Sequence, residues 1–195
     1  RAYVGMAIAL FLPEHYRRYA DLPENGGAVA AFAHFLSEGM AGGRPPSPLF
    51  DGRTYRDKLA ALQMPEPGPS EHEFAHWLAH GVPARIEPTV LYDENYQLQT
   101  YADLKSGRGW EFEHFLIHGV REGRNPNPLF ANSWYLGSHT FASRPPRPFY
   151  HYLLHGAAAG WRPCADFGAP PSPAETQETP LERVLKTLRF EGLQR

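Results

Sequence analysis

The residues best suited to metal chemistry lie near the middle of the chain, where His72, Glu73 and His76 form a His-Glu-x-x-His motif. On a helix, two imidazoles at this spacing can bind zinc while the glutamate activates a water molecule. The motif therefore predicts a zinc-dependent hydrolase as one alternative, with His72 and His76 as ligands and Glu73 as the base. Against it, Ser70 and Glu73 have the spacing of a helix capping box, and no strands are predicted for the sheet that such enzymes place beside this helix.

Besides His72 and His76, three further pairs of histidines are four residues apart. The pairs are His76 and His80, His114 and His118, and His151 and His155. Helical spacing places both imidazoles of a pair on one face, where they could supply two metal ligands, although structural zinc usually has four. The alternative is structural: the first histidine bonds to a nearby loop, and the second lies near a helix C-terminus, where positive charge is favourable. We therefore predict no bound metal and no cofactor.

Arginines and aromatic residues could form a surface that binds a ligand. Arg44 and Arg124 occur in matching Gly-Arg-x-Pro segments, and Arg85 and Arg162 occur at similar places. They could satisfy loop carbonyls or, together with the histidines, bind acidic glycans. The aromatic side chains could stack on sugars or form the core. The predicted interaction surface comprises His76, His80, His114, His118, His151, His155, Arg44 and Arg124.

The histidine pairs belong to a longer motif, Phe-x-His-aromatic-Leu-x-(His/Glu)-Gly, which occurs four times. The copies are residues 32–39, 74–81, 112–119 and 149–156, and successive first histidines are 42, 38 and 37 residues apart. A Gly/Pro-rich segment that ends in Leu-Phe follows, most clearly at residues 123–130. Upstream, the similar segments Glu-His-Tyr and Glu-Asn-Tyr align Tyr16 with Tyr96.

The spacing within the motif predicts a helix. Its Phe, aromatic and Leu positions at i, i+3 and i+4 form one apolar stripe, and the histidines lie on the opposite face. The terminal glycine predicts a left-handed residue that closes the helix, and the prolines that follow prevent the helix from resuming. The expected fold class is therefore all-α, with about four stacked helix–loop–helix repeats and Pro/Gly-rich return loops.

The predicted domain organisation has three parts. They are a helical repeat domain over residues 1–168, a Pro/Ser/Glu-rich linker over 169–178 and an amphipathic helix over 179–195. The repeats are expected at about 12–50, 51–92, 93–130 and 131–168. In the C-terminal segment, one apolar stripe comprises Leu181, Val184, Leu185 and Leu188. This stripe predicts a tethered helix that docks on the repeats, on a neighbouring domain or on a partner.

Composition excludes several classes of protein. The 195 residues, 42% of them hydrophobic, can form one large domain or two small ones. A net charge of −2 argues against a nucleic-acid partner. The single cysteine, Cys164, excludes an intramolecular disulfide framework. The apolar run over residues 2–12 is shorter than the roughly 20 residues of a bilayer span, so no transmembrane segment is expected.

The motif resembles a family of bacterial repeats of about 40 residues, which are found beside glycosyltransferases of cell-surface polysaccharide assembly and in exported surface proteins. The resemblance covers roughly residues 12–168 and is strongest over 119–130, where Glu-Gly-Arg-x-Pro-x-Pro-Leu-Phe is intact. This chain departs from the pattern at three places. Ala131 replaces an Asp, Arg85 lacks the preceding Glu-Gly, and Trp161 stands at the Arg position.

The resemblance implies a non-catalytic helical repeat module, a scaffold or docking element linked to bacterial cell-envelope polysaccharide biosynthesis. The expected partner is a protein or a covalently attached neighbouring domain, with a glycan as the second choice. The expected location is cytoplasmic or envelope-associated. Two alternatives remain: a structural subunit of a larger assembly that docks through its C-terminal helix, and the zinc hydrolase described above.

Overall fold

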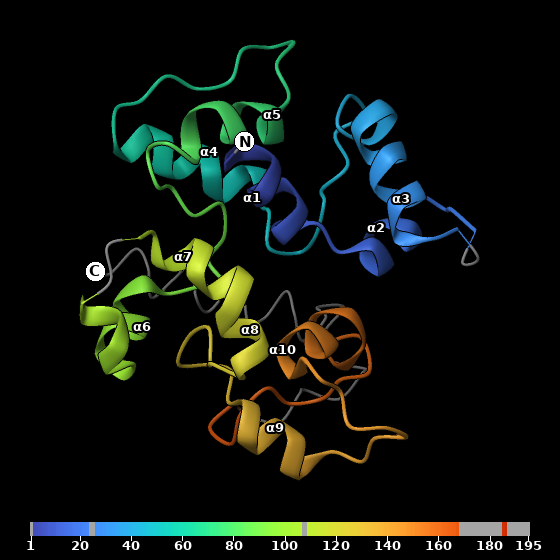
Figure 1. Cartoon of the computed structure of the whole chain (residues 1–195), viewed down its shortest axis with the longest axis vertical. Coiled ribbons are helices and arrows are strands. Elements are labelled where there is room, and N and C mark those ends of the chain that lie inside the picture. The colour runs from blue at the N-terminus through green and yellow to red at the C-terminus, as the bar shows by residue number, and fades with distance from the viewer. Residues whose placement is uncertain (1, 24–25, 107–108, 168–184, 187–195) are drawn as a thin grey trace. The chain divides into compact units, whose positions relative to one another are not determined.

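The computed structural model describes residues 2–23, 26–106, 109–167 and 185–186 (Figure 1). Over these residues the regular structure is helical and contains no strand, so the all-α prediction is confirmed. No helix in the described part of the chain has both the length and the apolar character that crossing a bilayer requires.

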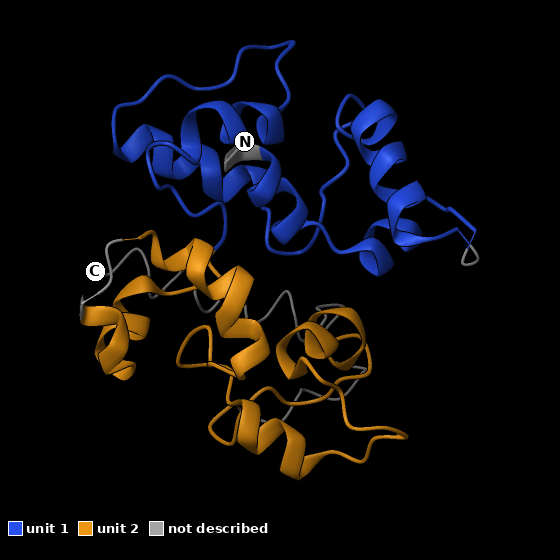
Figure 2. Cartoon of the chain, in the orientation of Figure 1, with its two compact units in different colours: residues 1–89 blue, residues 90–195 orange. Residues whose placement is uncertain are grey.

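The chain divides into two compact units, residues 1–89 and 90–195 (Figure 2). Unit 1 contains α1 (Ala2–Leu10), α2 (Pro13–Tyr19), α3 (Ala28–His34), η1 (Phe35–Gly39), α4 (Gly52–Ala61), α5 (Glu73–His76) and η2 (Trp77–Gly81). Unit 2 contains α6 (Glu94–Thr100), η3 (Ala102–Ser106), α7 (Glu111–His114), η4 (Phe115–Gly119), α8 (Val120–Glu122), α9 (Asn132–Ser138), α10 (Pro148–His151) and η5 (Tyr152–Gly156).

The predicted linker at 169–178 lies outside the described residues. Most of the helix predicted over 179–195 does so too, including Leu181, Val184 and Leu188. Leu185 and Lys186 are described, and both are helical. The tethered docking helix therefore stays a prediction.

Each motif copy begins as an α-helix and continues as one π-helical turn. The turns are η1, η2, η4 and η5, and each runs from the motif aromatic to the motif glycine. Their widened hydrogen bonds include Met40 N–H to the Phe35 carbonyl and Val82 N–H to the Trp77 carbonyl, both at 2.8 Å. The predicted helix is present, but its predicted end is wrong: Gly119, for example, has a right-handed helical φ of −55°.

The left-handed residue comes four positions after the motif glycine. Gly43, Gly123 and Gly160 have φ values of 73°, 71° and 74°, and Arg85 has 56° at the same place in the second copy. Glycine suits this position because its backbone adopts positive φ without a Cβ clash. The N–H of the next residue donates to the carbonyl of the motif glycine in every copy, as from Arg124 to Gly119 at 2.9 Å.

A backbone hydrogen bond closes each helix–loop–helix segment. The residue that caps the first helix donates its N–H to a proline carbonyl in the return loop that follows the second helix. The four bonds are Leu12 to Pro46 at 3.1 Å, Asp51 to Pro88 at 2.7 Å, Asp93 to Pro126 at 3.0 Å and Ala131 to Pro163 at 3.1 Å. The same closure therefore recurs four times along the chain.

The aromatic residue that ends each return loop packs on the next motif helix. Phe50 lies 5.0 Å from Phe74 and 5.8 Å from Trp77, measured between ring centroids. Phe130 and Tyr92 make the equivalent contacts in unit 2. Phe50 and Phe130 thus link the two segments within each unit.

The same contact is present before the first motif copy. Phe11 follows α1 and lies 5.0 Å from Phe32 and 5.4 Å from Phe35. Leu10-Phe11 was not predicted to be a copy of the Leu-Phe ending, because it follows a helix rather than a Gly/Pro-rich loop.

Candidate functional site

The first histidine of three motif copies shares a hydrogen bond with a buried tyrosine. The pairs are Tyr16 Oη with His34 Nδ1 at 2.8 Å, Tyr55 Oη with His76 Nδ1 at 2.8 Å, and Tyr135 Oη with His151 Nδ1 at 2.9 Å. Each tyrosine lies in the first helix of its segment, four residues after the cap, and is 0% exposed. In these copies the Nδ1 partner is therefore a helix tyrosine rather than the return loop.

The motif glycine makes room for that tyrosine. A Cβ added to Gly39 would lie 2.2 Å from Tyr16 Oη, and one added to Gly156 would lie 2.2 Å from Tyr135 Oη. Such distances are far inside van der Waals contact, so any side chain there would force the helix and the tyrosine apart. The recurrent histidine and glycine thus serve one buried contact.

The third copy departs from this pairing. Gln97 stands four residues after the cap Asp93, and its amide donates to the Asn125 carbonyl. Tyr96, which the sequence analysis aligned with Tyr16, lies one position earlier. That alignment is therefore off by one residue.

The zinc-hydrolase motif is not assembled. His72 caps α5, and its Nε2 accepts a hydrogen bond from the Gly43 N–H at 2.8 Å. The Glu73 carboxylate pairs instead with Arg56, with 2.7 Å between Oε1 and Nε. Both side chains thus have structural partners. The capping box is not formed either, because Ser70 lies two residues before the cap.

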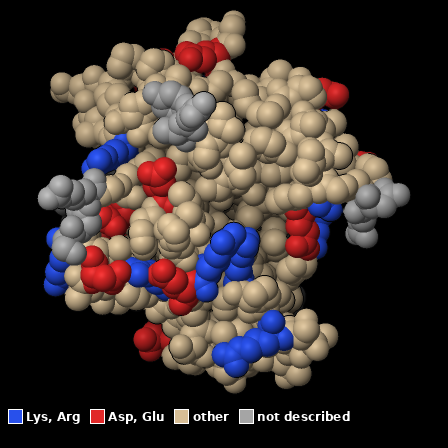
Figure 3. Space-filling view, viewed as in Figure 1, with Lys and Arg blue, Asp and Glu red and all other residues tan. Residues whose placement is uncertain are grey.

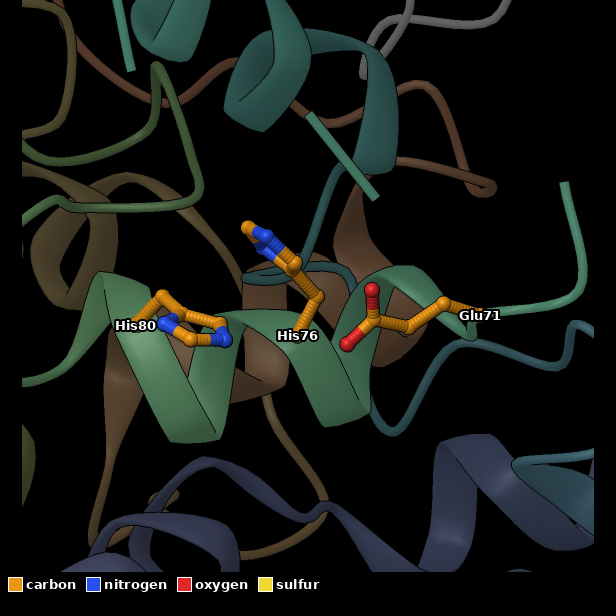
Figure 4. A group of neighbouring side chains, drawn as sticks. All are labelled: Glu71, His76 and His80. Atoms are coloured by element: carbon orange, nitrogen blue, oxygen red, sulfur yellow. The ribbon is translucent and has the colours of Figure 1, made fainter. Parts of the chain in front are cut away.

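A different group of potential ligands lies beside the same helix. One atom from each of Glu71, His76 and His80 lies within 4.8 Å of the other two (Figure 4). His76 is buried, whereas Glu71 and His80 are exposed. Figure 4 shows the Glu71 carboxylate turned toward His76, with His80 one turn farther along the helix. The sequence analysis missed Glu71 because it precedes the helix cap and lies outside the motif.

Burial shifts the pKa values of His76 and of its partner Tyr55. It lowers the pKa of the His76 imidazole, an effect that the Glu71 charge opposes and that His80 and Arg56 reinforce. Burial, together with the Glu71 charge, raises the pKa of Tyr55 to about 12. The Tyr55–His76 hydrogen bond therefore joins two neutral side chains near pH 7.

The other histidine pairs have the same proximity without this carboxylate. The ring centroids of both His114 and His118, and His151 and His155, are 5.1 Å apart. Where the second copy has Glu71, five residues before its first histidine, the third has Gly109 and the fourth has Pro146. Unit 1 thus contains a three-residue group where unit 2 has two-residue pairs at the equivalent positions.

Of the four loop arginines, only Arg44 and Arg124 are equivalent. Each directly follows a left-handed glycine. In the other two copies, the residue after the left-handed position is Ile86 or Trp161. Arg85 itself is the left-handed residue. The four arginines therefore do not occupy equivalent positions in the repeat.

Arg124 is held by contacts within its own segment. Its guanidinium lies 4.9 Å from the centre of the Tyr101 ring and pairs with Asp103 at 2.8 Å and Glu122 at 2.6 Å. In the fourth copy Trp161 stacks instead on His139, with 4.6 Å between ring centroids and 8° between planes. A cation–π pair in one copy and an aromatic pair in another make the same loop-to-helix contact, which indicates a structural role.

Unit 2 also has an open hollow of about 400 Å³. Its lining includes Arg121, Asn132, Arg144 and Pro148. The two arginines are exposed and could contact an acidic ligand such as a charged glycan.

Comparison of the chain with models of protein families, with curated proteins and with solved structures gives no match. The repeat family named from the motif therefore stays a prediction.

Proposed function

We propose that this chain is a non-catalytic helical repeat module that acts as a scaffold or docking element. Support comes from the structural roles of the residues that the sequence marked as candidates for chemistry. The motif histidines bond to tyrosines, the motif glycines admit those tyrosines, and Arg124 packs on Tyr101. These contacts stabilise each helix–loop–helix segment internally and do not form a catalytic arrangement.

The proposed architecture is a stacked array of about four helix–loop–helix repeats. The recurrent cap-to-proline bond closes each repeat, and the aromatic at the end of each return loop connects neighbouring repeats within a unit. Such nearest-neighbour packing is typical of repeat proteins, whose extended surfaces bind partners.

The observation that carries the docking proposal is an apolar face on the first motif copy, which we call the Leu36 face. It comprises Val29 on α3, 84% exposed, and Leu36 on η1, 49% exposed. The residues equivalent to Leu36 in the third and fourth copies, Leu116 and Leu153, are only 7% and 6% exposed. Leu78, the equivalent residue of the second copy, is half-buried. A position that the third and fourth copies bury is therefore open in the first, where covering it with another polypeptide would remove apolar surface from water.

The partner that we propose is a protein, within bacterial envelope polysaccharide biosynthesis as the family resemblance implies. On the face drawn in Figure 3, basic side chains lie beside acidic ones rather than forming a field of one sign. A surface of mixed charge does not attract a polyanion as a whole, so it favours a partner that is recognised through specific contacts. The hollow lined by Arg121 and Arg144 keeps an acidic glycan as the second candidate.

Site-specific photo-crosslinking in native host cells tests the proposal. A photoreactive amino acid at Leu36 should yield a discrete adduct with one protein, and the substitution Val29→Glu in the same chain should remove it. The matched control is Asp57, an exposed residue on α4. Equal adducts from both positions, or adducts containing glycan only, would contradict a protein partner on the Leu36 face.

The alternative of an assembly subunit that docks through its C-terminal helix predicts a different result. Deleting residues 170–195 should then abolish the crosslink from Leu36, whereas docking through the Leu36 face predicts that the crosslink persists.

A further inference from the structure

The geometry of Glu71, His76 and His80 suits a small metal ion. Their three potential ligand atoms lie within 4.8 Å of one another. Ligands of a tetrahedral zinc ion are about 3.3 Å apart, given bond lengths near 2.0–2.1 Å. Because Glu71 and His80 are exposed, their side chains can close this difference without disturbing the core.

His76 has the fixed orientation expected of a metal-binding histidine. It is 4% exposed, and its Nδ1 shares a 2.8 Å hydrogen bond with Tyr55 Oη. Binding a metal through Nε2 leaves the proton on Nδ1, which then donates to Tyr55 Oη. Partners of this kind hold the ring and select the tautomer in histidine metal sites.

The chemistry of the donor set selects the metal. Two imidazoles and one carboxylate suit zinc and related transition metals, whereas Mg²⁺ and Ca²⁺ prefer oxygen ligands throughout. Three protein ligands leave one tetrahedral position for water.

We propose that Glu71, His76 and His80 form a Zn²⁺ site in the second motif copy, independent of docking through the Leu36 face. It differs from the His-Glu-x-x-His reading of the sequence, since His72 and Glu73 are not ligands. Among the described residues, no third potential ligand joins the pairs at His114 and His151.

Calorimetric titration of the full, tag-free chain with ZnCl₂, after treatment with a chelator, tests the site. The chain should bind one Zn²⁺ per molecule at its tightest site. Glu71→Gln and His80→Ala should each weaken that binding at least tenfold. The matched control His118→Ala removes the equivalent histidine of the third copy and should leave the dissociation constant unchanged. MgCl₂ should give no saturable heat.

A second variant tests the role of the tyrosine as a positioning residue. Tyr55→Phe should weaken Zn²⁺ binding about 10–100-fold, as loss of a histidine partner does in other sites. Tyr135→Phe, the equivalent change in the fourth copy, should not affect it. Helical circular dichroism at neutral pH verifies that each variant is folded.

Three results would overturn the proposal. They are no saturable Zn²⁺ uptake by the folded chain, uptake that is unchanged in folded Glu71→Gln and His80→Ala chains, and uptake that His118→Ala weakens as strongly as His80→Ala does. None of these outcomes affects the crosslinking test, so the two proposals fail separately.

Discussion

At three of the four motif copies, a tyrosine hydroxyl lies between a histidine nitrogen and a helical glycine. The histidine supplies a buried partner for the hydroxyl, and the glycine leaves the space that the hydroxyl occupies. This arrangement explains why His and Gly recur at fixed spacing without any need for catalysis. In the third copy Gln97 stands in place of the tyrosine and donates to the Asn125 carbonyl instead.

Steric contact at the motif glycine gives a direct prediction. Gly156→Ala places a methyl group 2.2 Å from Tyr135 Oη, so we expect a loss of about 2 kcal/mol or more in the free energy of unfolding. Gly137→Ala on α9 is the matched control, because a Cβ there meets nothing within 4 Å. It should stabilise the chain by about 0.5–1 kcal/mol through helix propensity. Urea unfolding compares the two variants, and equal effects would refute the proposed close approach.

The side chain of His15 predicts a dependence of stability on pH. Burial, with a smaller effect from the Arg18 charge, lowers its pKa to about 4. The unfolded chain binds the proton near pH 6.5, so stability should fall as the pH decreases from about 6.5 to about 4.

The variant His15→Phe tests this dependence, because it keeps an aromatic ring and removes the titration. Relative to the parent, it should gain on the order of 2 kcal/mol in the free energy of unfolding between about pH 7.5 and about pH 4.5. Urea midpoints at the two pH values measure the difference. A constant difference would show that His15 does not titrate differently in the folded chain.

At the scale of elements, the apolar stripe was sufficient to predict the motif helices, because its Phe and aromatic positions are set by helical periodicity. Of the stripe, Phe112, Phe115 and Leu116 are buried, as expected, whereas Leu36 is exposed. The π-helical turns were not predictable, because such turns are rare and an apolar stripe with helical spacing predicts an α-helix. Tyr96 and Arg85 each lie one residue before the position that is equivalent to Tyr16 and Arg44. Residues of the same type were therefore matched in the sequence although they occupy different positions in the repeat.

The candidate metal site of Glu71, His76 and His80 was likewise only partly predictable from the sequence. His76 and His80 were identified by their helical spacing. Glu71 was not, since it precedes the helix and is brought near by the turn that leads into it. His72 and Glu73 match the zinc-binding pattern in the sequence, but in the structure His72 bonds to the Gly43 N–H and Glu73 pairs with Arg56.

The return loops predict a purely conformational effect. Gly123→Ala should lose about 1 kcal/mol in the free energy of unfolding, because φ of 71° is unfavourable for a residue with a Cβ, although nothing lies within 4 Å of the added atom. Gly68→Ala, at a loop glycine without positive φ, is the control and should be nearly neutral. Thermal or urea unfolding provides the comparison, and a neutral Gly123→Ala would contradict the left-handed assignment.

At the scale of the whole molecule, each of the two units contains two motif copies joined by an aromatic from the connecting loop. Phe50 joins the copies in unit 1, and Phe130 joins those in unit 2. Removing such a residue should therefore affect both neighbouring segments of its own unit.

Phe130→Ala tests this coupling. Deleting a buried aromatic costs about 3–5 kcal/mol, so amide hydrogen exchange should accelerate in α9 and α10 and also in α7. Exchange in α4, which belongs to unit 1, should stay unchanged. Acceleration confined to the loop around Phe130 would contradict cooperative packing, and equal acceleration in α4 would contradict the division into two units.

The central claim is that the chain docks a protein through the Leu36 face, and native mass spectrometry of the chain purified at its natural level tests it most directly. We predict that the parent chain carries a stoichiometric protein partner. Leu36→Glu should release this partner, whereas Asp57→Ala, a change at an exposed polar site, should retain it. A chain that carries the partner equally in both variants, or that carries none in the parent, would contradict docking through this face.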